Sequence, residues 1–98
     1  MKRSYMIEFE LPDSLTEEFL ALIPRQRYAV NELLVEGTIR SYALALDRSM
    51  IWAVIEAESE FEVLEIISQL PLSDQMHPHV SELFFHNAPE IIHNFSLN

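Results

Sequence analysis

Two side chains of this sequence stand where they could do chemistry. Arg40 lies in a run that is otherwise nearly apolar, and such an arginine usually pairs with a carboxylate of the protein or of a ligand. His86 closes the last apolar run, where an imidazole could donate or accept a proton near neutral pH. Each also has a structural explanation, an internal ion pair for Arg40 and a hydrogen-bonded strand end for His86. Both are candidates for ligand binding or proton transfer.

Two more histidines alternate in His77-Pro78-His79, so an extended backbone would place both imidazoles on one side. Two imidazoles could begin a metal site, but nearby spacing supplies no third ligand, and His93 is distant. We predict a loop that enters a strand, and no metal. The chain has no cysteine, which excludes thiolate sites and disulfides, and a single glycine, which argues against a glycine-rich phosphate loop. We therefore expect no cofactor.

The charge of the chain limits its partners. Sixteen acidic and six basic residues give a formal net charge of −10. Such a surface repels nucleic-acid backbones and anionic membranes, so we expect neither as a partner. No apolar run reaches membrane-spanning length, and no targeting segment precedes the first alternating run. The sequence predicts a soluble cytoplasmic protein.

Alternation, caps and turn residues predict one domain over residues 1–98, with a core at 4–86 and a tail at 87–98. The expected elements are a strand at 4–11, a helix from the Ser14-Leu15-Thr16-Glu17 capping box to Gly37, strands at 38–46 and 50–57, and a helix from Ser59 to Pro71. The last strand is expected at 80–86, with its first residues already extended from near Met76. Pro24 should kink or break the first helix at Leu20–Pro24. This order is the split-βαβ pattern, an α+β fold with a four-stranded antiparallel sheet and both helices on one face.

The two middle strands are apolar at both odd and even positions. They read Ile39-Arg-Ser-Tyr-Ala-Leu-Ala-Leu46 and Met50-Ile-Trp-Ala-Val-Ile55. Two helices can cover only one face of a sheet, so the other face should need a cover. Pairing with a second copy, sheet against sheet, is the simplest solution, and we expect a homodimer.

About half of the chain, from Gly37 to His86, resembles the muconolactone isomerase family. The matching residues are Gly37-Thr38-Ile39-Arg40, Trp52, Ser59, Gln69-Leu70-Pro71-Leu72, Met76, Val80, Leu83 and His86. The most specific element is the end of the second helix, at Gln69-Leu70-Pro71-Leu72. The resemblance implies a ferredoxin-like subunit that dimerises through its sheet, as a dimeric α/β barrel, and that can assemble further into rings of dimers. It also implies a cofactor-free isomerase that moves a proton within a small lactone, in an apolar pocket lined by Arg40.

The sequence departs from this family in the first helix. The family carries a glutamate–lysine acid–base pair there, and the corresponding stretch is Arg25-Gln26-Arg27-Tyr28. A glutamine cannot accept and return a proton at neutral pH, and an arginine stays protonated. By this alignment Gln26 and Arg27 become candidate substrate-binding residues, and the catalytic pair is missing.

Three functions stay open at this point. The first is a cofactor-free isomerase acting on a small lactone or organic acid, in which Arg40 binds a carboxylate and His86 or Tyr28 handles a proton. The second is a non-catalytic small-ligand-binding or assembly module of the same fold. The third is a relative of the cofactor-independent monooxygenases. Trp52 and Tyr42 could form pocket walls in any of them, or simply pack in the core or an interface.

Overall fold

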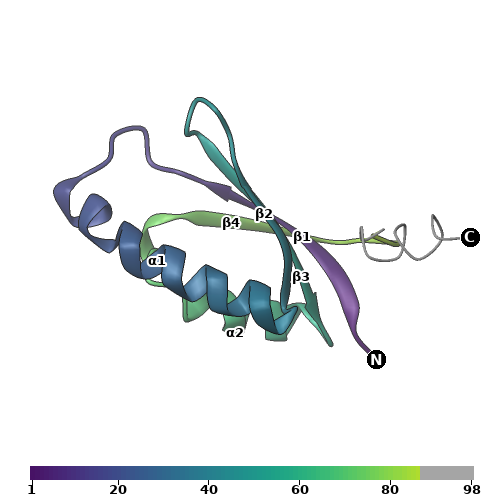
Figure 1. The fold of residues 1–98 in the computed structure, drawn as a ribbon. Helices are drawn as coiled ribbons and strands as arrows, with labels where there is room; N and C mark the ends of the chain where they lie inside the picture. Colours follow the sequence, from purple (N-terminus) through teal and green to yellow (C-terminus); the bar gives the residue numbers. More distant parts are fainter. Residues whose placement is uncertain (87–98) are drawn as a thin grey trace, which may run out of the picture.

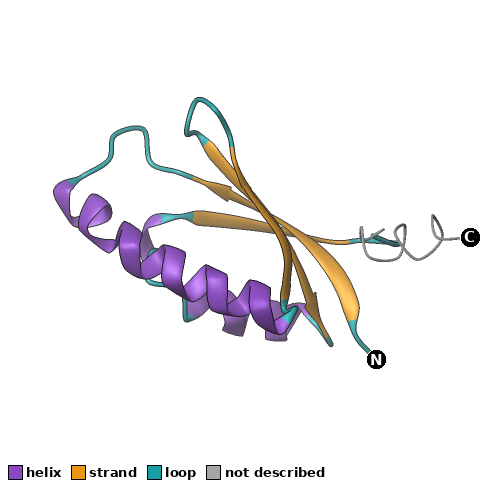
Figure 2. Ribbon diagram, in the orientation of Figure 1, coloured by secondary structure: helices purple, strands orange, loops and turns teal. Residues whose placement is uncertain are grey.

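The structure is a computed structural model that describes residues 1–86, and the predicted tail at 87–98 lies outside the described residues. Its elements are β1 (Arg3–Glu10), α1 (Glu17–Glu36), β2 (Ile39–Leu44), β3 (Met50–Ala57), α2 (Glu60–Ser68), a short 3-10 turn (Ser73–Gln75) and β4 (His77–Glu82). The strands form one antiparallel sheet in the order β2-β3-β1-β4, and both helices lie on the same side of it (Figures 1 and 2). The predicted ferredoxin-like α+β fold is confirmed. Within this described part, no helix is both long and apolar enough to cross a membrane.

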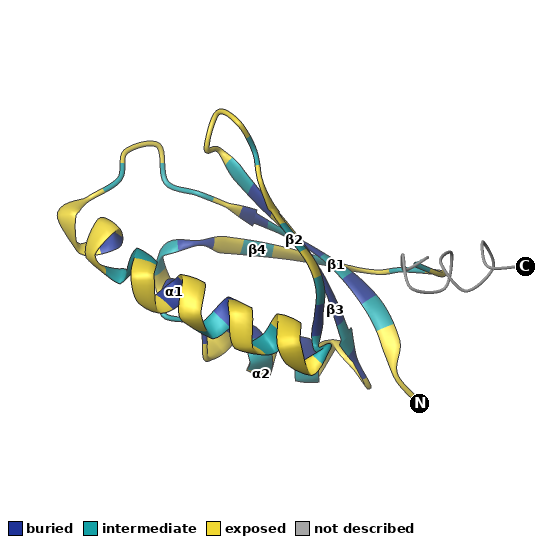
Figure 3. Cartoon of the chain, viewed as in Figure 1, coloured by how far each residue is buried: buried dark blue, intermediate teal, exposed yellow. Residues whose placement is uncertain are grey.

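The core lies between the sheet and the helices. Tyr5, Ile7 and Phe9 alternate along β1 and are each at most 1% exposed, as the apolar face of this strand predicted. They lie opposite odd-numbered residues of β3, including Ile51 and Ile55, which are also buried. Except for Val54, the buried strand residues therefore lie on the inner face of the sheet, and Figure 3 colours the buried positions dark blue. Burying apolar side chains in this layer supplies the main driving force for folding.

A β-bulge explains the mixed pattern of β2. Ile39 lies opposite Ile55, but the next paired residue is Ser41, so Arg40 is an extra residue in the ladder. Beyond the bulge, Tyr42 pairs with Ala53 and faces the helices. The inward-facing positions thus change from odd to even numbers within one strand. Apolar residues at both odd and even positions of β2 therefore do not place apolar side chains on both faces of the sheet. This corrects the expectation that β2 has two apolar faces.

The open face of the sheet keeps an apolar centre at β3. Val54 is 2% exposed and Trp52 is 38% exposed, and both lie on the side away from the helices. The same face also carries polar side chains, because Glu8 lies beside Trp52 on one side and His79 on the other. The open face is therefore a small apolar patch with a polar surround.

The helix α1 begins two residues after the position that the capping box suggests. The hydroxyl of Thr16, not that of Ser14, accepts the bond from the N–H of Phe19, at 3.1 Å. This start places two glutamates in the first turn, where negative charge is favourable, and turns Phe19 towards the core. At the other end, Gly37 adopts the left-handed conformation, with φ of 85°, as expected.

Of the kink or break expected at Leu20–Pro24, the structure rules out the break. The helix runs without interruption from Glu17 to Glu36 and contains Pro24 within it. Leu20, whose carbonyl loses its helical partner, is on the exposed side, where water can bind that carbonyl. The residues buried on either side of Pro24, Phe19 and Val30, anchor both halves of the helix to the same core.

The second half of the chain follows the predicted signals more closely. Ser59 caps α2 by accepting from the N–H of Glu62 at 3.1 Å, and the helix ends before Pro71. The strand β4 begins at His77, next to the expected start, but ends at Glu82 and not at His86. One further bond, from the N–H of Leu83 to the carbonyl of Ser4, continues this pairing beyond the end of the strand.

Candidate functional site

A pocket opens between the first half of α1 and the β2–β3 hairpin. Its volume is about 460 Å³, within the range that small-molecule sites usually have. Most of its wall is apolar, formed by Leu11, Leu15, Phe19, Leu20, Ile23 and Leu44. Its polar lining consists of Gln26, Arg27, Tyr42 and Arg48. The pocket therefore combines an apolar wall with a few polar groups, as ligand sites commonly do.

The start of α1 forms one end of this wall. Leu15 precedes the cap residue Thr16, and Leu20 is the fourth residue of the helix. These are the positions at which a hydrophobic staple fixes the angle of the entering chain. Both side chains line the pocket. The local signal that positions the helix thus also shapes the site.

Gln26 holds three parts of the fold together beside the pocket. It is 4% exposed, on the same side of α1 as Phe19 and Val30. Its Oε1 accepts a bond of 3.0 Å from the N–H of Leu72, in the turn after α2. Its Nε2 donates to the hydroxyl of Tyr42 on β2, at 3.3 Å. A buried amide with both ends bonded is a structural link, because an unpaired one would cost free energy.

Tyr42 is a half-buried titratable group of the pocket wall. Removal from water raises the pKa of its phenol above the usual value, and the bond from Gln26 lowers the pKa by a smaller amount. The pKa of a phenol is ordinarily about 10. A pKa above that value keeps Tyr42 neutral and protonated at physiological pH. It can donate a hydrogen bond but cannot act as a base there.

Two arginines give the pocket a positive charge. Arg27 lies on α1 and Arg48 lies in the hairpin, and both are exposed at the pocket. They are two of the six basic residues in a chain of net charge −10, and within residues 1–86 no aspartate or glutamate lines the pocket. An anion is repelled by most of the surface but attracted here. The electrostatics thus favour a ligand with a negative or strongly polar end.

The hairpin holds Arg48 in an unusual backbone conformation. Its φ is 64°, and it is the one described residue other than glycine with a positive φ. The preceding Asp47 stabilises the turn, since its Oδ1 accepts from both the N–H and the hydroxyl of Ser49. These two bonds lower the pKa of the Asp47 carboxyl. The turn chemistry, rather than packing, therefore places Arg48 at the pocket.

Of the six residues proposed from the sequence, the structure brings Gln26 and Arg27 to this pocket. Tyr42, a proposed wall residue, lies with them. The same three side chains also line a smaller pocket, of about 260 Å³, that continues along α1 to Leu34. These neighbours come from one helix and one strand, because the bulge at Arg40 turns Tyr42 towards α1.

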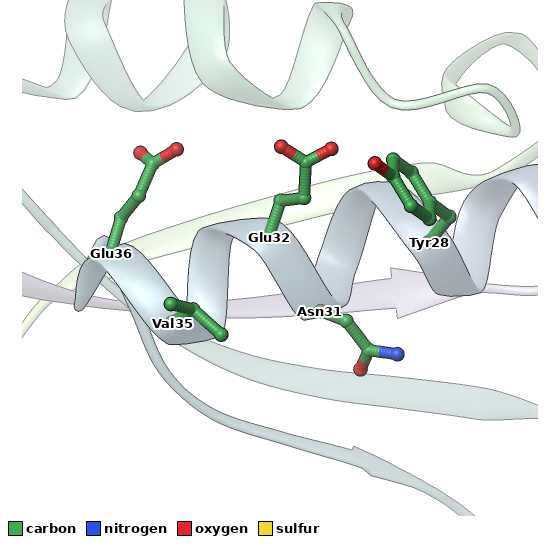
Figure 4. A pocket seen from close by; sticks show the side chains of 5 residues that line it. All are labelled: Tyr28, Asn31, Glu32, Val35 and Glu36. Carbon is green, nitrogen blue, oxygen red and sulfur yellow. The ribbon is translucent and has the colours of Figure 1, made fainter.

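Tyr28 lies on the outer surface of α1, away from this pocket. It is 68% exposed and lines a shallow groove with Asn31, Glu32, Val35 and Glu36 (Figure 4). A hydrogen bond to the Glu32 carboxylate, with the negative charge of that group, raises the pKa of the Tyr28 hydroxyl. Both side chains point the same way from the helix. Tyr28 therefore does not join the other candidates.

Arg40 and Trp52 also lie outside the pocket. Arg40 is the half-buried extra residue of the bulge, close to Gly37 at the end of α1. Trp52 is on the open face of the sheet, opposite Glu8 and Ala43. The sheet thus separates Trp52 from the helix-covered pocket.

His86 is at the far end of the molecule from the pocket. Beyond β4 the chain still pairs with the start of β1, through a bond from the N–H of Leu83 to the carbonyl of Ser4. The pocket lies at the other end of β1, beside Leu11. His86 follows Leu83 and so lies by the first residues of the chain. No single site can include both His86 and Gln26.

His77 and His79 belong to β4, not to a loop before it. They share the open face, as their alternation predicted, and lie opposite Glu10 and Glu8. Across residues 1–86, no group of three or more histidines and carboxylates is placed to hold a metal ion. His93, the distant third candidate, is outside the described residues.

Sequence reasoning did not single out Arg48 as a site residue. It stands in a short polar hairpin, where an arginine is usually taken as solvated. A usable signal was present in Gln26, which stands at an apolar position of the helical repeat, seven residues after Phe19 and four before Val30. A polar residue on a buried stripe indicates a specific hydrogen-bond partner.

Comparison with known proteins adds no family assignment. No protein-family model matches the chain, and a search of curated proteins finds no match to it.

Proposed function

We propose that this protein binds a small, mostly apolar organic acid or lactone in the pocket between α1 and the β2–β3 hairpin. The observation that carries the proposal is the lining of that pocket. Apolar side chains surround a neutral phenol, Tyr42, and two arginines stand at the pocket, which no carboxylate from the described part of the chain lines. The resemblance to muconolactone isomerases suggests the same class of ligand.

Binding without proton transfer is the activity that this lining supports best. The titratable groups among the lining residues are Arg27, Tyr42 and Arg48, and each is protonated at neutral pH. Gln26, at the position of the family's acidic residue, is bonded at both ends of its amide. A lactone isomerase needs a group that removes a proton, and none of these can serve. The non-catalytic binding module is therefore our preferred form of the proposal.

A pair of matched probes tests the proposed ligand class. Hydrocinnamate and phenylpropylamine share a phenyl ring and chain but carry opposite charges. We expect hydrocinnamate to shift the amide NMR signals of the pocket residues and to bind at least tenfold more tightly than the amine, because opposite charges at the arginines favour the anion (about 1.4 kcal/mol for tenfold). Equal affinities, or shifts confined to the open face of the sheet, would contradict the proposal.

We also propose that two subunits pair through their open sheet faces, as a homodimer that could assemble further. The supporting feature is the apolar centre of that face, where Trp52 is 38% exposed beside the buried Val54. Apolar patches of this kind commonly mark contact surfaces between proteins. Neither the pocket nor its arginines lie on this face.

A single lysine tests this pairing. We expect the protein to have a dimer mass by light scattering at micromolar concentration, and Trp52→Lys to have a monomer mass, since it would bury a charge between the sheets. The matched control is Phe61→Lys on α2, which is 71% exposed on the helix side of the molecule and should leave the mass unchanged. A monomer mass for the unmodified chain would refute the dimer.

A further inference from the structure

The hydrogen bonds around Gln26 have one possible direction. The backbone N–H of Leu72 can only donate, so the Gln26 atom that it meets at 3.0 Å must be the carbonyl oxygen Oε1. The amide nitrogen Nε2 then faces the Tyr42 hydroxyl, at 3.3 Å. Because this nitrogen also can only donate, the Tyr42 oxygen must accept. The N–H of Leu72 thus determines which end of the Gln26 amide carries the oxygen and which carries the nitrogen.

This direction leaves the proton of Tyr42 for another acceptor. A phenol has one O–H donor, and no hydrogen bond within residues 1–86 gives that donor an acceptor. The ring lines the pocket beside Phe19 and Ile23, whose side chains are apolar and offer none. Burial keeps the hydroxyl protonated. A ligand in the pocket is the remaining partner that could accept this proton away from bulk water.

We propose that Tyr42 presents a hydrogen-bond donor to the pocket, so that the site selects ligands with a carbonyl or carboxylate oxygen at that point over ligands with an N–H or O–H donor. Gln26 is the positioning residue, because its amide occupies the acceptor side of the Tyr42 hydroxyl. The inference rests on the proposed function and deepens it. It names the atom that the organic acid or lactone must place against β2.

Three bicyclic probes of similar size separate this polarity from simple apolar binding. Indane has no polar group, indanone has only an acceptor, and indole has only an N–H donor. We expect NMR titration of the full chain to show indanone binding about fivefold more tightly than indane, the gain of one neutral hydrogen bond. Indole should bind no more tightly than indane.

Two substitutions test the roles of Tyr42 and Gln26. Tyr42→Phe removes the donor, so indanone should bind only as well as indane, while the affinity for indane is kept. Gln26→Glu keeps an acceptor for the N–H of Leu72, but the ionised carboxylate draws the Tyr42 proton to itself. At mildly alkaline pH this variant should therefore prefer indole to indanone. A purely structural role for Gln26 would weaken all three probes equally and would not reverse their order.

The outcomes distinguish the two proposals. Failure of all three probes to bind the unmodified chain would refute the pocket and the polarity together. Binding of indane with no preference for indanone would refute the polarity alone, as would a preference that survives in Tyr42→Phe. If Gln26→Glu does not fold, the Tyr42→Phe comparison decides the question by itself.

Discussion

Replacing Gln26 by leucine is expected to lower the free energy of unfolding by about 1–3 kcal/mol, the usual cost of a buried polar group left without its partner. Leucine has a similar size, so the change removes hydrogen bonds and creates little cavity. The N–H of Leu72 is buried and would lose the oxygen that it meets at 3.0 Å. Tyr42 would lose its donor as well, but it lines the pocket, where water can replace that bond. Urea unfolding at a fixed protein concentration measures the difference.

The matched control is the same change at a glutamine that bonds at the surface. The Nε2 of Gln75 donates to the Glu18 carboxylate at 3.3 Å, in an exposed contact between the 3-10 turn and α1. Water can replace this bond, so Gln75→Leu should change the stability by less than about 0.5 kcal/mol. Equal losses at the two glutamines would mean that Gln26 is not the buried link that its contacts indicate.

Removing both pocket arginines should abolish most of the preference for anions. Arg27→Ala and Arg48→Gly are each expected to weaken hydrocinnamate binding about tenfold, and together about a hundredfold, as charge-assisted hydrogen bonds to a carboxylate are lost. Both arginines are exposed, so the losses should shrink at high salt. Calorimetry or NMR titration at two salt concentrations measures both effects.

Two features of the chain separate the effect of the pocket arginines from changes in backbone structure and in net charge. Arg48 has a φ of 64°, which glycine adopts without strain, so Arg48→Gly removes the charge without disturbing the hairpin. Arg25 is exposed on the same helix as Arg27 but is not among the lining residues. Arg25→Ala therefore changes the net charge equally and should leave the affinity unchanged. A loss as large at Arg25 would show that overall charge, and not this pocket, attracts the ligand.

Local signals in the sequence were enough to determine the order of the elements. Ser59 begins α2, Gly37 ends α1, and Pro71 follows the end of α2, because caps and breakers act on backbone groups a few residues away. Alternation in β1 identified its buried face for the same reason. The split-βαβ order then restricts the topology, since antiparallel strands with two crossing helices have few compact arrangements. For these elements, neighbours along the chain carry the information.

Local signals failed where packing outweighs them. Pro24 is a strong helix breaker, but α1 continues through it because both halves bury side chains in one core. Thr16, and not Ser14, is the N-cap residue of α1, because a helix that begins at Glu17 directs Phe19 into the core. A cap at Ser14 and a break at Pro24, one of the two alternatives expected there, each follow from neighbouring residues alone. Tertiary contacts selected the alternative.

The candidate site residues show most clearly which information the sequence carries and which only the tertiary structure supplies. Arg40 and His86 have the residue types for chemistry, but the sequence does not say that one lies in a bulge and the other at the far end of β1. The bulge changes which side of β2 faces the helices, and so brings Tyr42 to Gln26. The periodicity of the sequence does not indicate where such a bulge lies. One inserted residue moves every later side chain of the strand to the other face of the sheet.

The sequence by itself determined an acidic α+β domain whose proposed site residues included Gln26 and Arg27. Only the tertiary structure decided that Gln26 bonds the N–H of Leu72, 46 residues away, and that Arg48 stands at the same pocket. Caps and turns depend on neighbours in the chain, whereas a long-range bond depends on strand register and helix packing. Those are settled when the whole core is buried, and they decide which of the candidate residues meet.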